Sequence, residues 1–279
     1  MIKAVVIGGD ERAERLTSLL EKEGNRVYTL GLRPEEEACP IGEADIVLFP
    51  YPFSAPKGLV PNPRGLSINP LQILAQAKAG TYVLMGDDLY QELSAVEWMQ
   101  KGLCLSAYGQ DETFLEANAQ ISAEGAICYA MKQVPYTIAG SRDLVVGYGR
   151  FGRALARKLH ALGGLVTVAA RSERARQQAR DDGMEAIPLE DLPAAARQTQ
   201  IFLNTVAARV MMEEGLKAFS RDALLLELAS APYGFDREAA QALGLAVVLL
   251  PGIPARYAPQ SAAQALYDAI VHLTGGETP

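Results

Sequence analysis

The chain has 279 residues, of which 49% are hydrophobic and 21% are charged, and its formal net charge is −7. This composition is typical of a globular protein with room for two domains, and it excludes a disordered chain. Negative net charge without a concentrated basic patch argues against a nucleic-acid or anionic-membrane surface. No apolar run approaches membrane-spanning length, and a first strand at residues 2–7 leaves no room for a signal peptide, so we expect a cytoplasmic protein.

Three cysteines lie far apart in the sequence, at Cys39, Cys104 and Cys128. Because they form neither a Cys-x-x-Cys pair nor a cluster with histidine, we expect no structural metal and no disulfide framework. All three are predicted to be small buried hydrophobic residues rather than nucleophiles.

The first part of the chain alternates strands with helices, which is typical of a parallel α/β domain. Gly8-Gly9-Asp10 is predicted to form a turn in which Asp10 caps the next helix, and its place after a strand makes Asp10 a substrate-side candidate. Five prolines between Pro50 and Pro63 predict a stiff loop, either lining a cleft or purely structural. Strands are expected at 2–7, 26–30, 44–49, 81–85 and 104–108, and helices at 11–23, 69–78 and 87–100.

Two helices are predicted next, at residues 111–118 and 122–134. The second leads directly into the following strand, so we expect it to bridge two domains. Glu124 lies in its predicted first turn. There it fits equally well as a cleft-facing carboxylate, and thus a substrate candidate, or as an acid that complements the helix dipole.

The most informative stretch is residues 143–171, which predict a strand, a glycine turn, a helix and a second strand. The first strand runs into Gly147-Tyr-Gly-Arg-Phe-Gly152, a complete G-x-G-x-x-G motif. Glycine is needed for the tight turn, for close approach of the backbone to a diphosphate, and for close packing of the helix on the strand. Since helix 150–162 and strand 165–170 follow as required, we predict a dinucleotide site rather than a merely tight turn. Its phosphate-side residues are Gly147, Gly149, Arg150, Phe151 and Gly152.

The end of the second strand distinguishes the two nicotinamide cofactors. An NAD site usually has an acidic residue there, roughly 20 residues past the glycines, to accept hydrogen bonds from the ribose hydroxyls. This chain has Arg171, whose guanidinium would pair with a 2′-phosphate, and Ser172, which would add a hydroxyl. We therefore predict NADP, with Arg174 as a further candidate. Arg174 and Arg176 also fit the solvated face of the next helix, and for Arg176 we prefer that interpretation.

Strands and helices continue to alternate to the end of the chain. Because doubly wound sheets bind ligands at the carboxyl ends of their strands, the tips of the last three strands predict the nicotinamide lining. A last helix, through about residue 273, is predicted to be capped by Ser261 and to pack back on the first domain. Further helices are expected at 173–182, 193–198, 211–219 and 237–243, and strands at 186–189, 201–203, 224–228 and 246–250. The expected lining residues are Asn204, Thr205, Ala229, Ser230, Pro251 and Gly252.

These elements predict an α/β protein with two doubly wound parallel-sheet domains. Residues 1–120, joined by the C-terminal helix 260–279, are expected to form a flavodoxin-like domain on the substrate side. Residues 121–259 are expected to form a Rossmann domain that binds NADP.

Several motifs, in this order, resemble the A-subunit family of dipicolinate synthase, the bacterial sporulation enzyme. The similarity runs over nearly the whole chain. Its most specific parts are Tyr-Thr-Ile-x-Gly-Ser before the glycine motif and the Leu-Ala-Ser and Pro-Gly-x-Pro strand tips. The matching stretches are residues 7–10, 136–141, 147–152, 170–172, 204–205, 228–230, 251–254 and 258–259.

The resemblance implies an NADP-dependent oxidoreductase that, with a flavoprotein-like B subunit, converts dihydrodipicolinate to dipicolinate. Its architecture would resemble the 2-hydroxy-acid and alanine dehydrogenases, and we expect a homo-oligomer. A ring carbon would give a hydride to the nicotinamide while the neighbouring position loses a proton. Since aromatisation helps to drive this reaction, no catalytic base is assigned, and the protein would orient the ring and hold two carboxylates.

Four positions depart from the family pattern, and two of the changes remove a cation that could meet a dicarboxylate. Residues 231–234 are Ala-Pro-Tyr-Gly in place of Arg-Pro-Gly-Gly, and Gln260 stands in place of Lys. Glu227 replaces Asp, and residues 204–207 lack the usual Pro. Arg209 and Arg256 are candidates to replace the missing cations.

Two other functions are compatible with the sequence. An NADP-dependent 2-hydroxy-acid dehydrogenase needs a general acid, usually a histidine oriented by a carboxylate. The two histidines, His160 and His272, lie late on predicted helices and not at strand tips, which counts against this function unless a tyrosine such as Tyr257 serves instead. A non-catalytic NADP-binding protein is the second alternative, and the missing cations fit it.

Overall fold

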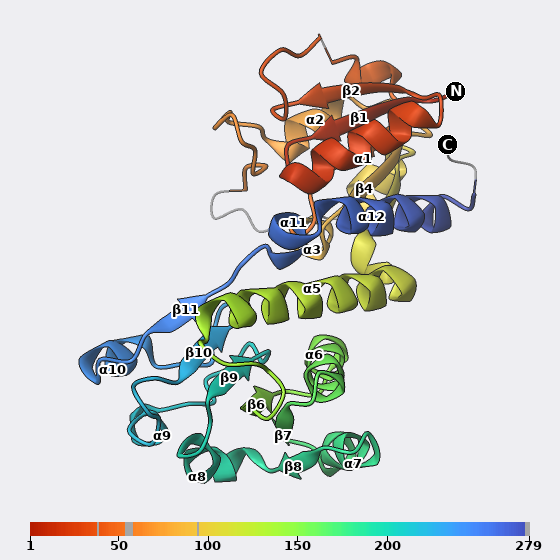
Figure 1. The fold of residues 1–279 in the computed structure, drawn as a ribbon. Coiled ribbons are helices and arrows are strands. Elements are labelled where there is room, and N and C mark those ends of the chain that lie inside the picture. Colours follow the sequence, from red (N-terminus) through yellow and green to blue (C-terminus); the bar gives the residue numbers. More distant parts are fainter. Residues whose placement is uncertain (38, 54–57, 94, 277–279) are drawn as a thin grey trace. The chain divides into compact units, whose positions relative to one another are not determined.

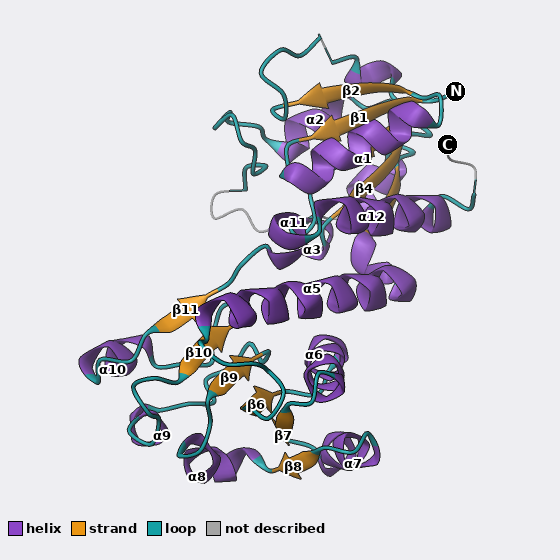
Figure 2. Ribbon diagram, viewed as in Figure 1, coloured by secondary structure: helices purple, strands orange, loops and turns teal. Residues whose placement is uncertain are grey.

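The computed structural model describes residues 1–276 except 38, 54–57 and 94 (Figure 1). The chain divides into two compact units: unit 1 comprises Met1–Asn118 and Pro254–Pro279, and unit 2 comprises Ala119–Ile253. Each unit holds one parallel sheet with helices on both of its faces (Figure 2). The predicted fold class, two doubly wound parallel-sheet α/β domains, is confirmed.

Unit 1 is built on a five-stranded sheet in the order β2-β1-β3-β4-β5, the strand order of flavodoxin-like folds. The order reverses between β1 and β3, so the carboxyl ends of these strands border the place where such sheets bind ligands. Both strands are apolar and almost wholly buried, as the central strands of a parallel sheet must be. The elements are β1 (Lys3–Ile7), α1 (Glu11–Lys22), β2 (Arg26–Leu30), β3 (Ile46–Leu48), α2 (Pro70–Gln76), β4 (Tyr82–Met85), α3 (Asp87–Glu92), α4 (Ala95–Gln100), β5 (Cys104–Ala107) and α12 (Pro259–Leu273).

The last helix, α12, packs along α1 within unit 1, as predicted (Figure 1). Its buried side consists mostly of alanine, which lets the two helices approach closely. Near its end, His272 Nδ1 lies 2.9 Å from Asp111 Oδ2. Asp111 also accepts a hydrogen bond from the amide of Thr113. It thereby connects α12 to the start of helix α5 (Glu112–Gln133). The buried residues of α12 are Ala262, Ala263, Ala265, Leu266, Ala269 and Ile270.

Unit 2 contains a six-stranded sheet in the order β11-β10-β9-β6-β7-β8, which is the strand order of Rossmann domains. Here the order reverses between β6 and β9. Leu144 and Val146 of β6 pack with Phe202 in an apolar cluster on one face, and Val145 points to the other face because strands alternate. The elements are β6 (Arg142–Val146), α6 (Arg150–Ala161), β7 (Leu165–Ala169), α7 (Glu173–Asp181), β8 (Glu185–Ile187), α8 (Leu192–Ala196), β9 (Ile201–Asn204), α9 (Glu213–Leu216), β10 (Leu224–Glu227), α10 (Arg237–Ala242) and β11 (Val247–Leu249). Two helices, α5 (Glu112–Gln133) and α11 (Ile253–Tyr257), contain the points at which the chain passes from one unit to the other.

One continuous helix, α5, replaces the two helices predicted between residues 111 and 134. Neither glycine nor proline separates residues 112 and 124, so nothing in the backbone ends the helix there. The division between the two units falls inside this helix. Glu124 therefore lies in the helix interior, and its interpretation as an acid of a first helical turn was wrong.

Helix ends account for the other differences from prediction. The expected helix 87–100 is split into α3 and α4 because the backbone at Leu93 is extended, and Gly86 rather than an aspartate occupies the N-cap of α3. Helix α12 begins at Pro259, a residue suited to the first helical position, so Ser261 lies in its first turn and does not cap it.

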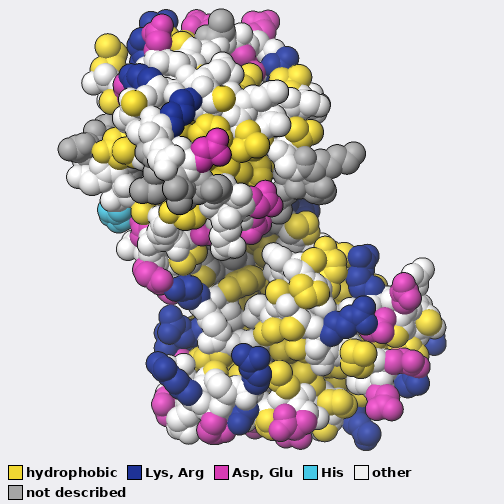
Figure 3. Space-filling model, turned by 180° about the vertical axis from the view of Figure 1, so that it is seen from behind, with side chains coloured by type: hydrophobic (Ala, Val, Ile, Leu, Met, Phe, Trp, Pro, Cys, Tyr) yellow, Lys and Arg dark blue, Asp and Glu magenta, His cyan; other side chains and the backbone are white. Residues whose placement is uncertain are grey.

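The surface carries charges of both signs and one exposed thiol. Acidic and basic side chains are interspersed on the face seen in Figure 3. Cys104 is exposed and Cys39 and Cys128 are only partly buried, so the prediction that all three are buried was wrong. Cys104 is exposed because it opens β5, a strand at the edge of its sheet. In the described part of the chain, no helix is both long enough and apolar enough to cross a membrane.

A buried carboxyl group lies at the start of β6. Asp143 is 1% exposed, and its Oδ1 accepts a hydrogen bond of 2.8 Å from Ser141 Oγ. Its Oδ2 is buried and has no hydrogen-bond partner among the described residues. Burial raises the pKa of Asp143 from its ordinary value of 3.8 to about 6.

This pKa predicts a pH-dependent stability. Because the folded chain holds the Asp143 proton more tightly than the unfolded chain, the free energy of unfolding should fall as pH rises from 4 to 7, by about 2 kcal/mol. In Asp143→Asn this contribution should be lost. Urea unfolding at several pH values measures it as the difference between wild type and variant, and the exposed Asp222→Asn is the control. A pH-independent difference between wild type and Asp143→Asn would contradict the assignment.

Candidate functional site

The candidate site lies at the carboxyl edge of the sheet of unit 2, where β6 turns into α6. Gly147 ends the strand with φ +96°, a conformation that favours glycine. A Cβ on Gly147 would lie 2.6 Å from Thr205 Oγ1. The amide of Gly147 donates to the carbonyl of Ala169 over 2.9 Å, which holds the turn against the end of β7. Glycine is thus required here by both conformation and space.

The other two glycines have opposite surroundings. A Cβ on Gly152 would lie 2.2 Å from the carbonyl oxygen of Gly147, so α6 packs on the turn with backbone against backbone. A Cβ on Gly149 would meet nothing within 4 Å. Gly149 is the N-cap of α6 and has no capping side chain, and the first amides of a helix lack intrahelical acceptors. The turn therefore offers open space and a helix N-terminus, the combination that binds phosphate groups.

Tyr148, between the first two glycines, anchors the turn, and the sequence pattern gave no indication of this. Its ring is buried, and its hydroxyl donates to Asp182 Oδ2. Asp182 also accepts two hydrogen bonds of 2.8 Å from Arg157, one from Nε and one from Nη2. Burial, followed by the hydrogen bond to Asp182, raises the pKa of Tyr148, so the hydroxyl stays a donor. This chain of contacts joins the turn to the far end of α7.

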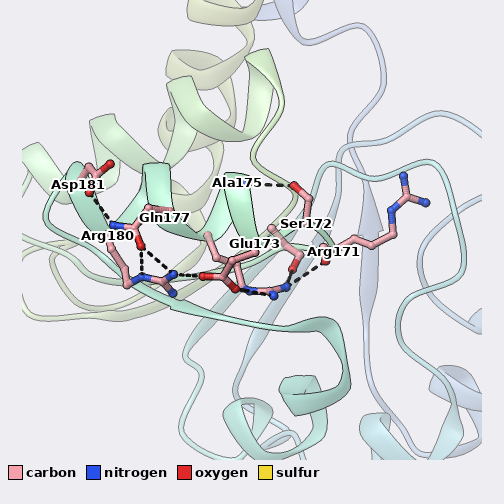
Figure 4. A network of polar contacts seen from close by, with 9 residues as sticks. Arg171, Ser172, Glu173, Ala175, Gln177, Arg180 and Asp181 are labelled. Carbon is pink, nitrogen blue, oxygen red and sulfur yellow. Dashed lines mark hydrogen bonds and ion pairs between the residues drawn. The ribbon is translucent and has the colours of Figure 1, made fainter.

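The end of β7 carries the residues predicted to select the cofactor. Arg171 is exposed, and within the described residues its guanidinium forms no hydrogen bond or ion pair. Figure 4 shows this side chain extending away from the other charged groups. Ser172 is the N-cap of α7 and its Oγ accepts a hydrogen bond from the amide of Ala175, which leaves its own hydroxyl proton available. Arg174 is exposed on the first turn of α7.

Arg176 is not part of a solvated helix face, and the prediction was wrong. Its side chain is 16% exposed, and Nη1 donates to the carbonyl oxygens of Ala170 at 2.7 Å and Arg171 at 3.0 Å. Nε and Nη2 donate to Glu173 Oε2 at 2.9 and 2.7 Å. A basic residue at the fourth position of a helix is usually solvated, so only the structure shows that this one folds back on the strand end.

The tip of β9 is occupied by structural hydrogen bonds. Asn204 is fully buried, and its Nδ2 donates to Glu227 Oε1 at 2.7 Å and to the carbonyl of Val206 at 2.8 Å. Thr205 Oγ1 donates to the carbonyl of Val146 at 2.8 Å. The Asn204 amide thus faces strand β10, and the expectation that Asn204 and Thr205 border the nicotinamide site stays a prediction. These side chains hold the strand tips in register.

Glu227 is the acceptor around which the tip of β10 is arranged. It is 1% exposed, and it accepts from the amide of Gly234 at 2.7 Å and of Ala229 at 3.2 Å, in addition to Asn204. Burial raises the pKa of Glu227. The remaining predicted lining residues, Ala229, Ser230, Pro251 and Gly252, follow the ends of β10 and β11, and all but the half-buried Ala229 are exposed.

The strand order brings the candidates together along one edge. Neighbouring strands run β11, β10, β9, β6 and β7, so the tips with Pro251, Ser230 and Thr205 come before the glycine turn, and Arg171 comes after it. A dinucleotide lying along this edge would meet Arg171 at one end, the glycine turn in its middle and the tips of β9 and β10 at the other end.

The four substrate candidates have different surroundings. Asp10 caps α1, and its carboxylate accepts hydrogen bonds from Arg12 Nε at 2.9 Å and Nη2 at 2.6 Å. Glu124 forms an ion pair of 2.9 Å with Lys158. Arg209, after β9, and Arg256, on α11, are both exposed.

Arg12 is a residue that the sequence analysis missed. It is 6% exposed, and it lines a cavity of about 20 Å³ where β1 and β3 end. Gly8, Asp10 and Tyr108 also line this cavity. In the sequence, an arginine in a first helical turn looks like any solvated residue. The reversal of strand order between β1 and β3 is what indicates that Arg12 lies near a ligand position.

Both histidines lie in the last turns of helices and do not follow the end of a strand. His160 is exposed in the last turn of α6, and His272 is in the last turn of α12 beside Asp111. Neither lines the small cavity of unit 1.

Comparison with known proteins gives consistent results. Residues 112–238 match the family model of the D-isomer specific 2-hydroxyacid dehydrogenase, NAD binding domain. The chain is 26% identical to the dipicolinate synthase A subunit of Bacillus subtilis (strain 168) over 289 residues, which cover 98% of this chain and 95% of that protein. The crystal structure of the dipicolinate synthase A subunit from Bacillus halodurans has a TM-score of 0.84 and 25% identity, covering 100% of this chain and 98% of that one. D-2-hydroxyisocaproate dehydrogenase, with a TM-score of 0.58 at 15% identity, shares the fold.

The predicted resemblance to the A subunits of dipicolinate synthase is thus confirmed. The family model supports a nicotinamide dinucleotide as cofactor and an oxidoreductase as the class of protein. It does not distinguish NAD from NADP.

The surroundings of the glycines predict different consequences for two alanine variants. Gly152→Ala should destabilise the fold by about 1–3 kcal/mol, because its Cβ meets the backbone of Gly147. Gly149→Ala should change stability by about 1 kcal/mol or less, yet weaken dinucleotide binding, because its Cβ enters the open space above the turn. Urea unfolding and titration calorimetry with NADP measure both effects. Wild-type affinity in Gly149→Ala would show that the diphosphate lies elsewhere.

Proposed function

We propose that this chain, a homologue of the dipicolinate synthase A subunits, is an NADP-dependent oxidoreductase that converts dihydrodipicolinate to dipicolinate. The observation that carries the cofactor assignment is the exposed Arg171 guanidinium at the end of β7, one strand away from the open glycine turn. The observation that carries the substrate is the homology over 98% of the chain.

The residues of this edge fit a bound NADP. The amides of Arg150, Phe151 and Gly152, at the start of α6, would receive the diphosphate in the space left open by Gly149. Arg171 would pair with the 2′-phosphate, Ser172 would donate its hydroxyl proton, and Arg174 would add positive charge. The backbone after β10 and β11, at Ala229, Ser230, Pro251 and Gly252, would border the nicotinamide, with Asn204 and Thr205 holding these tips in place.

The bound cofactor would supply the hydride acceptor, and the chain would orient the substrate ring against it. Loss of a hydride and a proton makes the ring aromatic, so positioning contributes more than a dedicated base would. The two carboxylates of such a substrate need cations. Arg209 and Arg256 remain our candidates, because their guanidinium groups are exposed. Asp10 and Glu124 are already paired with Arg12 and Lys158, and we propose that they act through these partners.

We also propose the assembly and location implied by the sequence. Homology to one named component of a synthase implies that the chain works with a second, different component. We propose that this partner is a flavoprotein-like B subunit, that the chain forms homo-oligomers, and that it works in the cytoplasm during sporulation.

A 2-hydroxy-acid dehydrogenase is the second candidate function, because the matching family model comes from that class. The positions of the histidines argue against it. His272 has a carboxylate partner, as the catalytic histidine of such enzymes needs, but it lies in the last turn of α12 rather than at a strand tip. A non-catalytic protein that binds NADP is the third possibility.

One assay separates the three functions. Absorbance of NADPH or NADH is followed after NADP or NAD is mixed with the protein and either freshly generated dihydrodipicolinate or a simple 2-hydroxy acid, with and without the B subunit, and NADPH binding is measured by titration calorimetry. We expect NADPH to form with NADP and more slowly with NAD. Oxidation of simple 2-hydroxy acids instead would favour the second function, and NADPH binding without turnover under all conditions would favour the third.

Removal of the arginine at the end of β7 tests the cofactor. Arg171→Ala should weaken NADP binding by about 1–3 kcal/mol and leave NAD binding nearly unchanged, because only NADP loses a charge-assisted pair. Dissociation constants from titration calorimetry give both values. Arg197→Ala, an exposed arginine at the end of α8, is the matched control. Equal losses for both cofactors would show that the 2′-phosphate does not lie on Arg171.

A further inference from the structure

A carboxylate lies close to the proposed phosphate position. Glu173 is the first residue of α7, two residues after Arg171, in the region where NAD sites usually carry an acidic side chain. A free carboxylate here would accept hydrogen bonds from the ribose hydroxyls of NAD and repel the 2′-phosphate of NADP. The same strand end therefore contains a group that favours NADP and a group that would favour NAD.

The structure shows that Glu173 is held by two arginines of its own helix. Arg176 donates two hydrogen bonds to Glu173 Oε2, at 2.9 and 2.7 Å, and Arg180 Nη2 donates to Oε1. The hydrogen bonds from Arg176 and then that from Arg180 lower the pKa of Glu173, so its carboxylate stays ionised and accepts from both arginines. Figure 4 shows the carboxylate facing Arg180 while the Arg171 side chain extends in the other direction.

Arg176 makes a second set of contacts that Arg180 does not make. Its Nη1 donates to the carbonyl oxygens of Ala170 and Arg171, at 2.7 and 3.0 Å. One guanidinium thus fixes the backbone from which the Arg171 side chain leaves and also holds the nearby carboxylate. Its side chain is 16% exposed, against 38% for Arg180, so Arg176 is the more buried of the two arginines.

We propose that Arg176 is a positioning residue that determines the preference for NADP over NAD. It keeps Glu173 away from the ribose and fixes the direction of Arg171, without itself contacting the cofactor. This inference rests on the proposed binding of the 2′-phosphate at Arg171.

The experiment measures dissociation constants of NADP and NAD for the full chain and its variants. Arg176→Ala should reduce the NADP preference, expressed as the ratio of the two constants, by about 10-fold, because a repulsive carboxylate is released and Arg171 is less well fixed. Adding Glu173→Gln to Arg176→Ala should restore part of the ratio, since the released group is then uncharged. Arg180→Ala keeps every contact of Arg176 and is the matched control. Its ratio of the two dissociation constants should lie within about 3-fold of the wild-type ratio.

The outcomes separate this inference from the proposed function. If wild type prefers NADP through Arg171 but Arg176→Ala keeps the wild-type ratio, or weakens both cofactors equally, Arg176 has only a structural role and the inference is wrong. If wild type shows no preference for NADP that depends on Arg171, the proposed NADP specificity is wrong, and the role of Arg176 fails with it. Should Arg176→Ala fail to fold, Arg176→Gln, which keeps a donor for the Ala170 carbonyl, is measured in its place against the same criteria.

Discussion

The site of unit 2 depends on the contact between the start of α6 and the turn that precedes it. A Cβ at Gly152 would lie only 2.2 Å from the Gly147 carbonyl oxygen, so the helix reaches this position only because no side chain intervenes. The close approach places the first amides of α6 at the carboxyl edge of the sheet, beside the point where strand order reverses. The neighbouring contacts support this arrangement: Tyr148 anchors the turn through Asp182, and Asn204 and Glu227 hold the adjacent tips.

The charges around this edge are distributed unequally. Three carboxylates of this region have partners within the protein: Asp182 is paired with Arg157, Glu173 with Arg176 and Arg180, and Glu227 with an amide and backbone N–H groups. The Arg171 guanidinium, in contrast, has no ion pair among the described residues. An anion approaching the end of β7 therefore meets an uncompensated positive charge and little repulsion. The pairing of these acids and the unpaired arginine are the basis of our proposal that this edge binds a phosphorylated ligand.

Local patterns in the sequence predicted most of the fold but only part of the site. Alternating apolar strands and amphipathic helices, and glycines with a steric requirement such as Gly147, are local properties, and both sheets followed from them. The sequence failed where tertiary contacts decide a role. Arg176 looks like a solvated helical residue, yet it binds two strand-end carbonyls. At Asn204 the sequence did not indicate that the amide donates a hydrogen bond to the buried carboxylate of Glu227. The single helix α5 was predicted as two helices, although neither glycine nor proline interrupts the sequence between residues 112 and 124.

We propose that the adenosine end of a phosphorylated dinucleotide lies beside Arg171 while its diphosphate contacts the start of α6. The most direct measurement is a crystal structure of the full chain grown with NADP. We expect density for the 2′-phosphate within hydrogen-bonding distance of Arg171 and Ser172, and for the diphosphate against the backbone of Gly149 to Gly152. A dinucleotide bound elsewhere, or bound with its ribose turned away from the end of β7, would contradict it.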